Sequence, residues 1–71
     1  MVRIHDVREG ASVLKTGPCG RDDGNTVGFV YNVTGVERDT DGYVRGFYIR
    51  THDGLYAGHV SPRNFGRFTI M

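Results

Sequence analysis

The sequence has one cysteine, two prolines and no tryptophan in 71 residues. Because Cys19 has no second cysteine to pair with, the disulfides that support many small secreted scaffolds are absent. No apolar run approaches the roughly 20 residues that span a bilayer, and residues 1–6 lack the apolar stretch of a signal peptide. We therefore expect a soluble protein that is not exported and works in the reducing cytoplasm.

Charge of one sign is also lacking, since nine basic residues stand against eight acidic ones and the formal net charge is +1. This balance argues against a protein whose main function is to bind a polyanion. Arginine makes up nearly all of the basic residues, however, so nucleic-acid binding is still a possible function. A chain of this length has room for one small core. We expect residues 1–71 to form a single domain without a large enzyme pocket.

Glycine is abundant, with 11 residues, and together with Asp and Asn it divides the chain into short runs rich in Val, Phe, Tyr, Ile and Thr. No stretch keeps a helical period for more than a turn, so the pattern predicts an all-β fold. The five expected strands are residues 12–16, 26–38, 43–51, 55–60 and 67–70. The glycine-rich segment 17–25 is expected to form a long mobile loop, and Ser61-Pro62 followed by Gly66 predicts a 3-10 turn before the last strand.

Two turns fix the expected strand registers. Asp53-Gly54 is typical of a two-residue type I′ turn, which pairs His52 with Leu55, Arg50 with Ala57 and Tyr48 with His59. A three-residue loop at 40–42 avoids placing Arg38 opposite Arg45. It instead places Glu37 opposite Arg45 and Val33 opposite Ile49. The core face expected from these registers consists of Val13, Phe29, Tyr31, Val33, Phe47, Ile49, Tyr56, Val60, Phe68 and Ile70.

This order of strands, long first loop, tight hairpins and 3-10 turn resembles the small five-stranded SH3-like barrel. The resemblance covers Glu9 to Ile70 of this chain. A narrower resemblance lies in Gly10-Ala11-Ser12-Val13, Gly17 and Gly28-Phe29-Val30, which is similar to the start of the KOW motif. The KOW resemblance implies an association with transcription or translation machinery.

The residues that carry metal or covalent chemistry lie apart in the sequence. No two of His5, Cys19, His52 and His59 have zinc-finger spacing, and in the expected hairpin the last two histidines are roughly 13 Å apart. Cys19 has no identifiable base beside it, and the aspartates fall in expected turns. We expect no metal site, no cofactor and no enzymatic activity.

The expected binding surface is the outer face of the central hairpins. It brings together an aromatic ring, a guanidinium and an imidazole, and its residues are Tyr48, Arg50, His59, Asn32 and Val36. Tyrosine and arginine are enriched at protein-binding hot spots, whereas grooves for proline-rich peptides usually depend on a tryptophan. The leading hypothesis is a non-catalytic interaction module that binds, and regulates, a larger protein assembly. The alternative hypothesis is a barrel that binds RNA or single-stranded DNA. A third interpretation is that the arginines are simply scattered over a solvated surface without a binding role.

Overall fold

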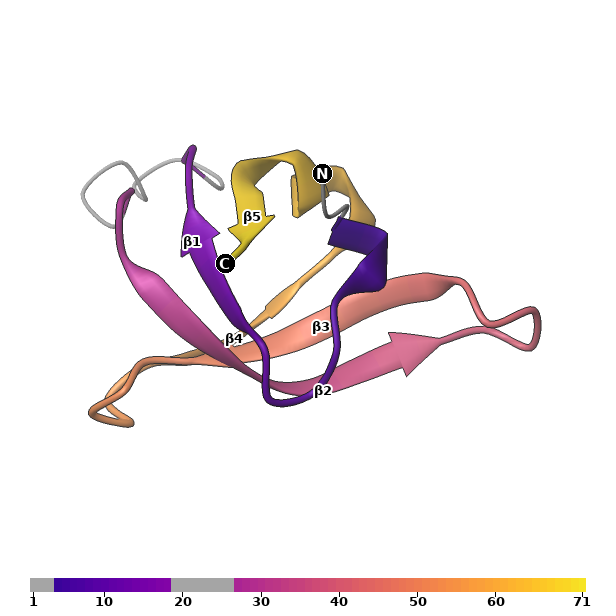
Figure 1. Cartoon of the computed structure of the whole chain (residues 1–71), viewed down its shortest axis with the longest axis horizontal. Helices are drawn as coiled ribbons and strands as arrows, with labels where there is room; N and C mark the ends of the chain where they lie inside the picture. The colour runs from indigo at the N-terminus through magenta and orange to yellow at the C-terminus, as the bar shows by residue number, and fades with distance from the viewer. Residues whose placement is uncertain (1–3, 19–26) are drawn as a thin grey trace.

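The computed structural model describes residues 4–18 and 27–71 of the chain. Five strands form one antiparallel sheet in the order β4-β3-β2-β1-β5, which confirms the all-β prediction (Figure 1). The strands are β1 (Ser12–Lys15), β2 (Val30–Arg38), β3 (Val44–Arg50), β4 (Ala57–Val60) and β5 (Phe68–Ile70). Within the described residues two short 3-10 segments accompany them, η1 (Ile4–Asp6) and η3 (Pro62–Arg67), the second at the position where a 3-10 turn was expected.

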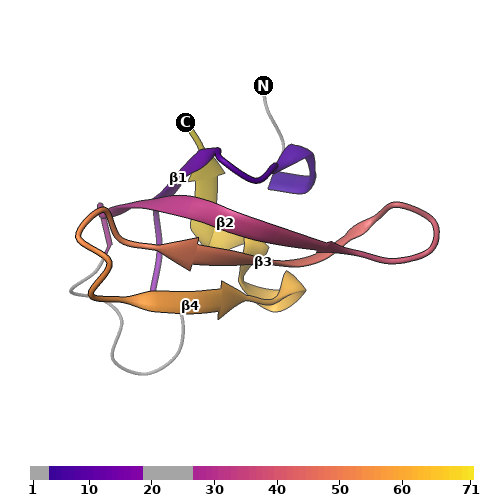
Figure 2. The same cartoon turned by 90° about the horizontal axis from the view of Figure 1, so that it is seen from below.

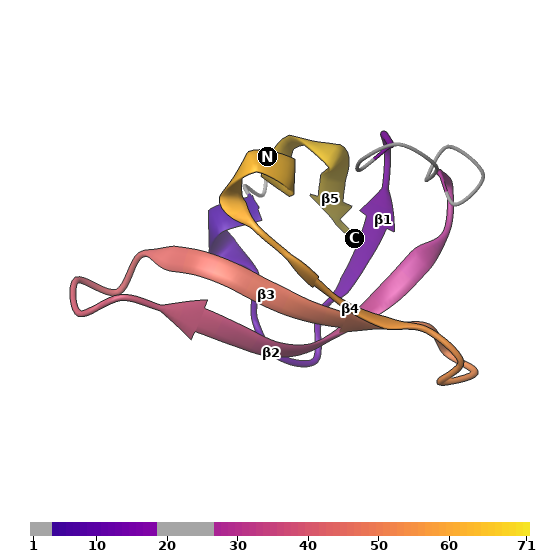
Figure 3. The same cartoon turned by 180° about the vertical axis from the view of Figure 1, so that it is seen from behind.

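The sheet bends over its own core without closing into a barrel. Strands β2, β3 and β4 lie side by side, while β1 and β5 cross them on the core side (Figure 2). In the described part of the chain, β4 and β5 are the two end strands and do not pair with each other. Between them in the chain runs η3, whose buried Phe65 stacks on Phe47 with ring centroids 5.6 Å apart (Figure 3). The expected closed barrel is not confirmed, because these two end strands stay unpaired with each other in the described residues.

The core lies on the inner face of this bent sheet. Its buried side chains are Val7, Val13, Tyr31, Val33, Val44, Phe47, Ile49, Val60, Phe65 and Phe68. Most of the expected core is confirmed, but Phe29 and Tyr56 were wrongly placed in it, since they are 52% and 51% exposed. Both residues alternate in phase with the core residues, but β4 and β5 do not pair in the described residues, and the open side of the sheet leaves both side chains partly uncovered.

The β3–β4 hairpin has the expected register with a different turn. Tyr48 pairs with His59 and Arg50 pairs with Ala57, as predicted. The type I′ turn is wrong, because Gly54 has a positive φ of 76° while no other type of residue has a positive φ in the described part of the chain. Asp53 instead holds the turn by accepting hydrogen bonds from the Thr51 hydroxyl at 2.6 Å and the Leu55 amide at 3.0 Å.

The β2–β3 hairpin keeps the expected register at its two ends but not between them. At the tip Arg38 pairs with Val44, as a three-residue loop at 40–42 predicts, and Gly42 has a positive φ of 87°. Val33 pairs with Ile49 as predicted, but the register then shifts between Val33 and Gly35, so that Gly35 faces Tyr48 and Val36 faces Phe47. An extra residue in one strand reverses the faces of the residues that follow it. Val36 consequently packs against the core, and its expected place on the outer face is wrong.

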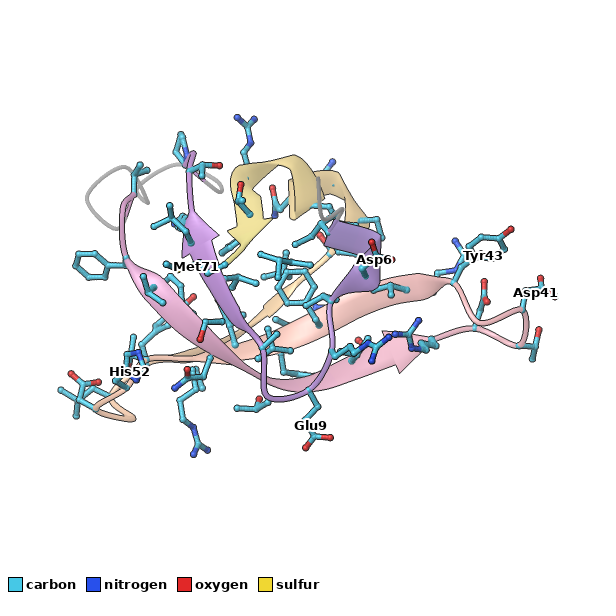
Figure 4. The ribbon with its side chains drawn as sticks, viewed as in Figure 1. Asp6, Glu9, Asp41, Tyr43, His52 and Met71 are labelled. Atoms are coloured by element: carbon cyan, nitrogen blue, oxygen red, sulfur yellow. The ribbon has the colours of Figure 1, made fainter. Side chains whose placement is uncertain are left out.

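The far end of this hairpin is held by Asp39 rather than by a pair between Glu37 and Arg45. Glu37 faces Gly46 instead, and a second register shift follows it. Arg45 contacts the Asp39 carboxylate through Nη2 at 2.7 Å and Nε at 2.8 Å. The backbone amides of Asp41 and Tyr43 donate to the same carboxylate at 2.9 and 3.0 Å. Figure 4 shows Asp41 and Tyr43 at this tip, at the opposite end of the long hairpin from His52.

The contacts of Asp39 predict a loss of stability in acid. Desolvation raises its pKa, but hydrogen bonds from the Tyr43 amide, the Arg45 side chain and the Asp41 amide outweigh it and hold the pKa below the ordinary 3.8. A lowered folded-state pKa contributes stability that is complete above 3.8 and is lost as pH falls through the folded-state pKa.

Asp39→Asn is therefore expected to lower the melting temperature at neutral pH and to have less effect as the pH is taken below 3.8. Asp41→Asn is the matched control, since the Asp41 carboxylate accepts no hydrogen bond in the described part of the chain. The pKa of Asp53 is also lowered, chiefly by the Thr51 hydroxyl, so part of the acid dependence persists in the variant. An effect of Asp39→Asn that stays constant with pH would contradict this account.

Two further expectations concern the long first loop and membrane-spanning segments. Most of the loop predicted at 17–25, with Cys19, lies outside the described residues. Within the ranges that are described, no helix has the length and apolar character needed to cross a membrane.

Candidate functional site

The side chain of Tyr48 lies at the centre of the outer face of the sheet, where it contacts residues of both neighbouring strands. The Tyr48 ring contacts the His59 ring with centroids 4.8 Å apart. On its other side it covers Gly35, where an added Cβ would lie 3.5 Å from Tyr48 Cδ2. An added Cβ at this distance would make an ordinary van der Waals contact with the ring, which lies between His59 of β4 and Gly35 of β2, and Tyr48 remains 45% exposed.

A second glycine lets His59 reach across the sheet. His59 Nε2 contacts Glu37 Oε1 in a side-chain hydrogen bond that joins β4 to β2. The imidazole passes over Gly46 on β3, where an added Cβ would lie 2.8 Å from His59 Cε1 and 3.1 Å from Glu37 Oε1. A side chain at position 46 would therefore displace the pair.

Asn32 and Arg50 lie at the other end of the outer face. They are cross-strand partners, and Asn32 Nδ2 lies 3.3 Å from His52 Nδ1. Arg50 is exposed, and it has no ion-pair or hydrogen-bond partner for its guanidinium among the described residues. The structure thus brings Tyr48, His59, Asn32 and Arg50 together as the sequence predicted, and leaves Val36 out. No group of three metal-ligating side chains occurs within residues 4–18 and 27–71.

The seam pocket is a cavity on the inner side of β4, toward β1 and β5, and was not predicted from the sequence. Its volume is about 360 Å³. Its lining residues are Lys15, Phe29, Tyr31, Ile49, Thr51, Tyr56, His59, Val60, Asn64 and Phe68. Tyr31 is buried between two of the other rings, with centroids 6.0 Å from Tyr56 and 6.4 Å from Phe68.

The rim of the seam pocket carries exposed aromatic rings. Phe29 and Tyr56 line the cavity while each remains about half exposed, at 52% and 51%. Tyr56 turns back along β4, so that an added Cβ at Gly58 would lie 2.8 Å from its hydroxyl oxygen. Rings that are partly buried and partly open fit the apolar surface of another molecule better than they fit water.

Chemically, the lining of the seam pocket is mostly aromatic and aliphatic, and Thr51, Asn64 and the buried Lys15 add polar groups to it. Such cavities take an apolar or aromatic group and orient it through a few polar contacts. The comparisons found no matching family model, curated protein or solved structure for this chain.

Proposed function

We propose that this chain is a non-catalytic module that binds a partner protein through the seam pocket and its aromatic rim. The observation that carries the proposal is the pair of half-exposed rings, Phe29 and Tyr56, at the mouth of a cavity of about 360 Å³. Exposed aromatic side chains around a pocket are the usual anchors of protein interfaces, and they need no net charge.

We further propose that the fold is an open relative of the SH3-like barrel, acting in the cytoplasm. The strand order β4-β3-β2-β1-β5 and the 3-10 segment before β5 support the relationship. The single cysteine supports a reducing compartment.

Nucleic acid is the weaker candidate because two arginines of the long hairpin are already engaged by the chain itself. Arg45 is bound to Asp39, and Arg38 donates to the carbonyls of Gly42 at 3.0 Å and Val7 at 3.4 Å. These contacts compete with phosphate binding, which depends on available basic side chains.

Capture experiments with matched variants test the proposal. The immobilised chain is expected to retain a protein from nuclease-treated lysate of the source cells, and Phe29→Ser is expected to lose it. Leu55→Ser is the control, because Leu55 is also apolar and 88% exposed but does not line the pocket. Equal retention by both variants, or binding that needs nucleic acid and falls steeply with salt, would contradict the proposal.

A further inference from the structure

The outer edge of β4 is an unpaired strand edge beside the seam pocket. β4 is an end strand of the sheet, and among the described residues it pairs only with β3. His59 and Val60 of β4 line the pocket, so the cavity reaches the strand itself. An exposed edge of this kind is a template for another extended chain.

The hydrogen-bond alternation identifies which backbone groups point outward. The Thr51 amide donates to the Tyr56 carbonyl at 3.0 Å, which makes these two residues a hydrogen-bonded pair. In an antiparallel ladder such pairs alternate with non-hydrogen-bonded ones, so Gly58 and Val60 bond to β3. The amide and carbonyl groups of Ala57 and His59 therefore point to the free edge. No backbone bond to another element engages them in the described part of the chain.

The two faces of this edge differ in chemistry. On the inner side the edge runs past Gly58, which has no side chain, and the Tyr56 ring that turns over it toward the pocket. On the outer side Arg50 is the cross-strand neighbour of Ala57, whose methyl group leaves the edge open. His59 of β4 reaches over Gly46 of β3 to contact Glu37 of β2. In the same way, the Arg50 side chain of β3 can reach over Ala57 of β4 to a strand that adds at the free edge.

We propose that the partner protein contributes an extended segment that adds to β4 as a sixth strand, with an acidic side chain opposite Ala57 and an apolar side chain opposite Gly58. This inference rests on the proposed function and adds its binding mode. The backbone of Ala57 and His59 bonds to the incoming strand, the apolar side chain enters beside Tyr56, and the acidic side chain meets Arg50. The alternation follows from the two-residue period of a strand.

A display library of random peptides of about seven residues, selected on the immobilised chain, tests this binding mode. Selected sequences are expected to alternate, with an acidic residue next to an apolar one. A synthetic peptide of the selected sequence is then expected to slow hydrogen exchange at the amides of Ala57 and His59. Gly58 and Val60 serve as internal controls, because their amides already bond to β3. This readout needs no variant of the protein.

Variants provide a second readout. Ala57→Pro removes an outward amide, and it is expected to weaken peptide binding about ten-fold or more, whereas Ala57→Ser leaves it nearly unchanged. Arg50→Gln is expected to weaken binding about two- to five-fold, and only for peptides that carry the acidic residue. A peptide that is N-methylated at the residue opposite Ala57 is expected to lose binding in the same way.

Other results would overturn the binding mode. The first is protection of the Ala57 and His59 amides in the free chain, the second is a library that yields no binder, and the third is bound peptides that leave both amides unprotected. If bound peptides leave these amides unprotected but are lost with Phe29→Ser and retained with Leu55→Ser, strand addition fails while the proposed function stands. If the Phe29→Ser variant binds these peptides as tightly as the unaltered chain does, the proposed function of the seam pocket fails together with strand addition.

Discussion

Replacing Phe47 with alanine is expected to lower the free energy of unfolding by about 3 to 5 kcal/mol. Phe47 is fully buried at the centre of β3. Its ring stacks on Phe65 of η3 at 5.6 Å and meets the edge of Phe68 of β5 at 5.9 Å. The substitution therefore removes the ring contacts that join β3 to both η3 and β5.

This loss approaches the whole stability of so small a core. Chemical or thermal denaturation followed by circular dichroism measures it, with Leu55→Ala as the control for an exposed apolar side chain that is 88% accessible. An unchanged melting temperature for Phe47→Ala would show that the inner and outer faces of the sheet are assigned the wrong way round.

Replacing Tyr56 with alanine is expected to weaken partner binding by about 2 kcal/mol or more, roughly thirty-fold, while leaving the fold intact. Tyr56 is half exposed, lines the seam pocket and packs against the buried Tyr31 at 6.0 Å. A ring held on one side by the core loses little freedom on binding, which is why such rings act as anchors. Titration calorimetry with the captured partner measures the change in affinity.

Tyr48→Ala provides the comparison between the two faces. Tyr48 is exposed to a similar extent, 45%, but lies on the outer face against His59. A larger loss of affinity from Tyr48→Ala than from Tyr56→Ala would move the centre of the interface from the seam pocket to the outer face.

The sequence predicted the strands and the base of each hairpin because these depend on local signals. Alternating apolar residues specify the strands, and the pairings of Tyr48 with His59 and of Arg38 with Val44 follow from turn length. Val33 pairs with Ile49 as predicted because the two register shifts between this pair and the turn offset each other. A glycine such as Gly35 does not show, from the sequence, how many residues of one strand will face each residue of its neighbour. The register shift beside it, and with it the inward face of Val36, depends on packing against Phe47 across the sheet.

The residues of the outer face could be brought together from the sequence, whereas the seam pocket could not be predicted. Tyr48, His59 and Arg50 come together because they belong to one hairpin whose register is local. The seam pocket depends on β4 and β5 staying apart, and these strands are separated in sequence by η3. Phe29 and Tyr56 alternate in phase with core residues, so the pattern alone assigned them to the core, and only the open sheet exposes them.

A partner protein that binds across the seam pocket is expected to perturb the pocket's aromatic rim and the free edge of β4. Chemical-shift mapping with the captured partner, titrated into the isotope-labelled chain, measures this perturbation residue by residue. The largest changes are expected at Phe29, Tyr56, Ala57 and His59. Changes confined to residues 39–43 at the tip of the long hairpin, with these four residues unaffected, would contradict binding across the seam pocket.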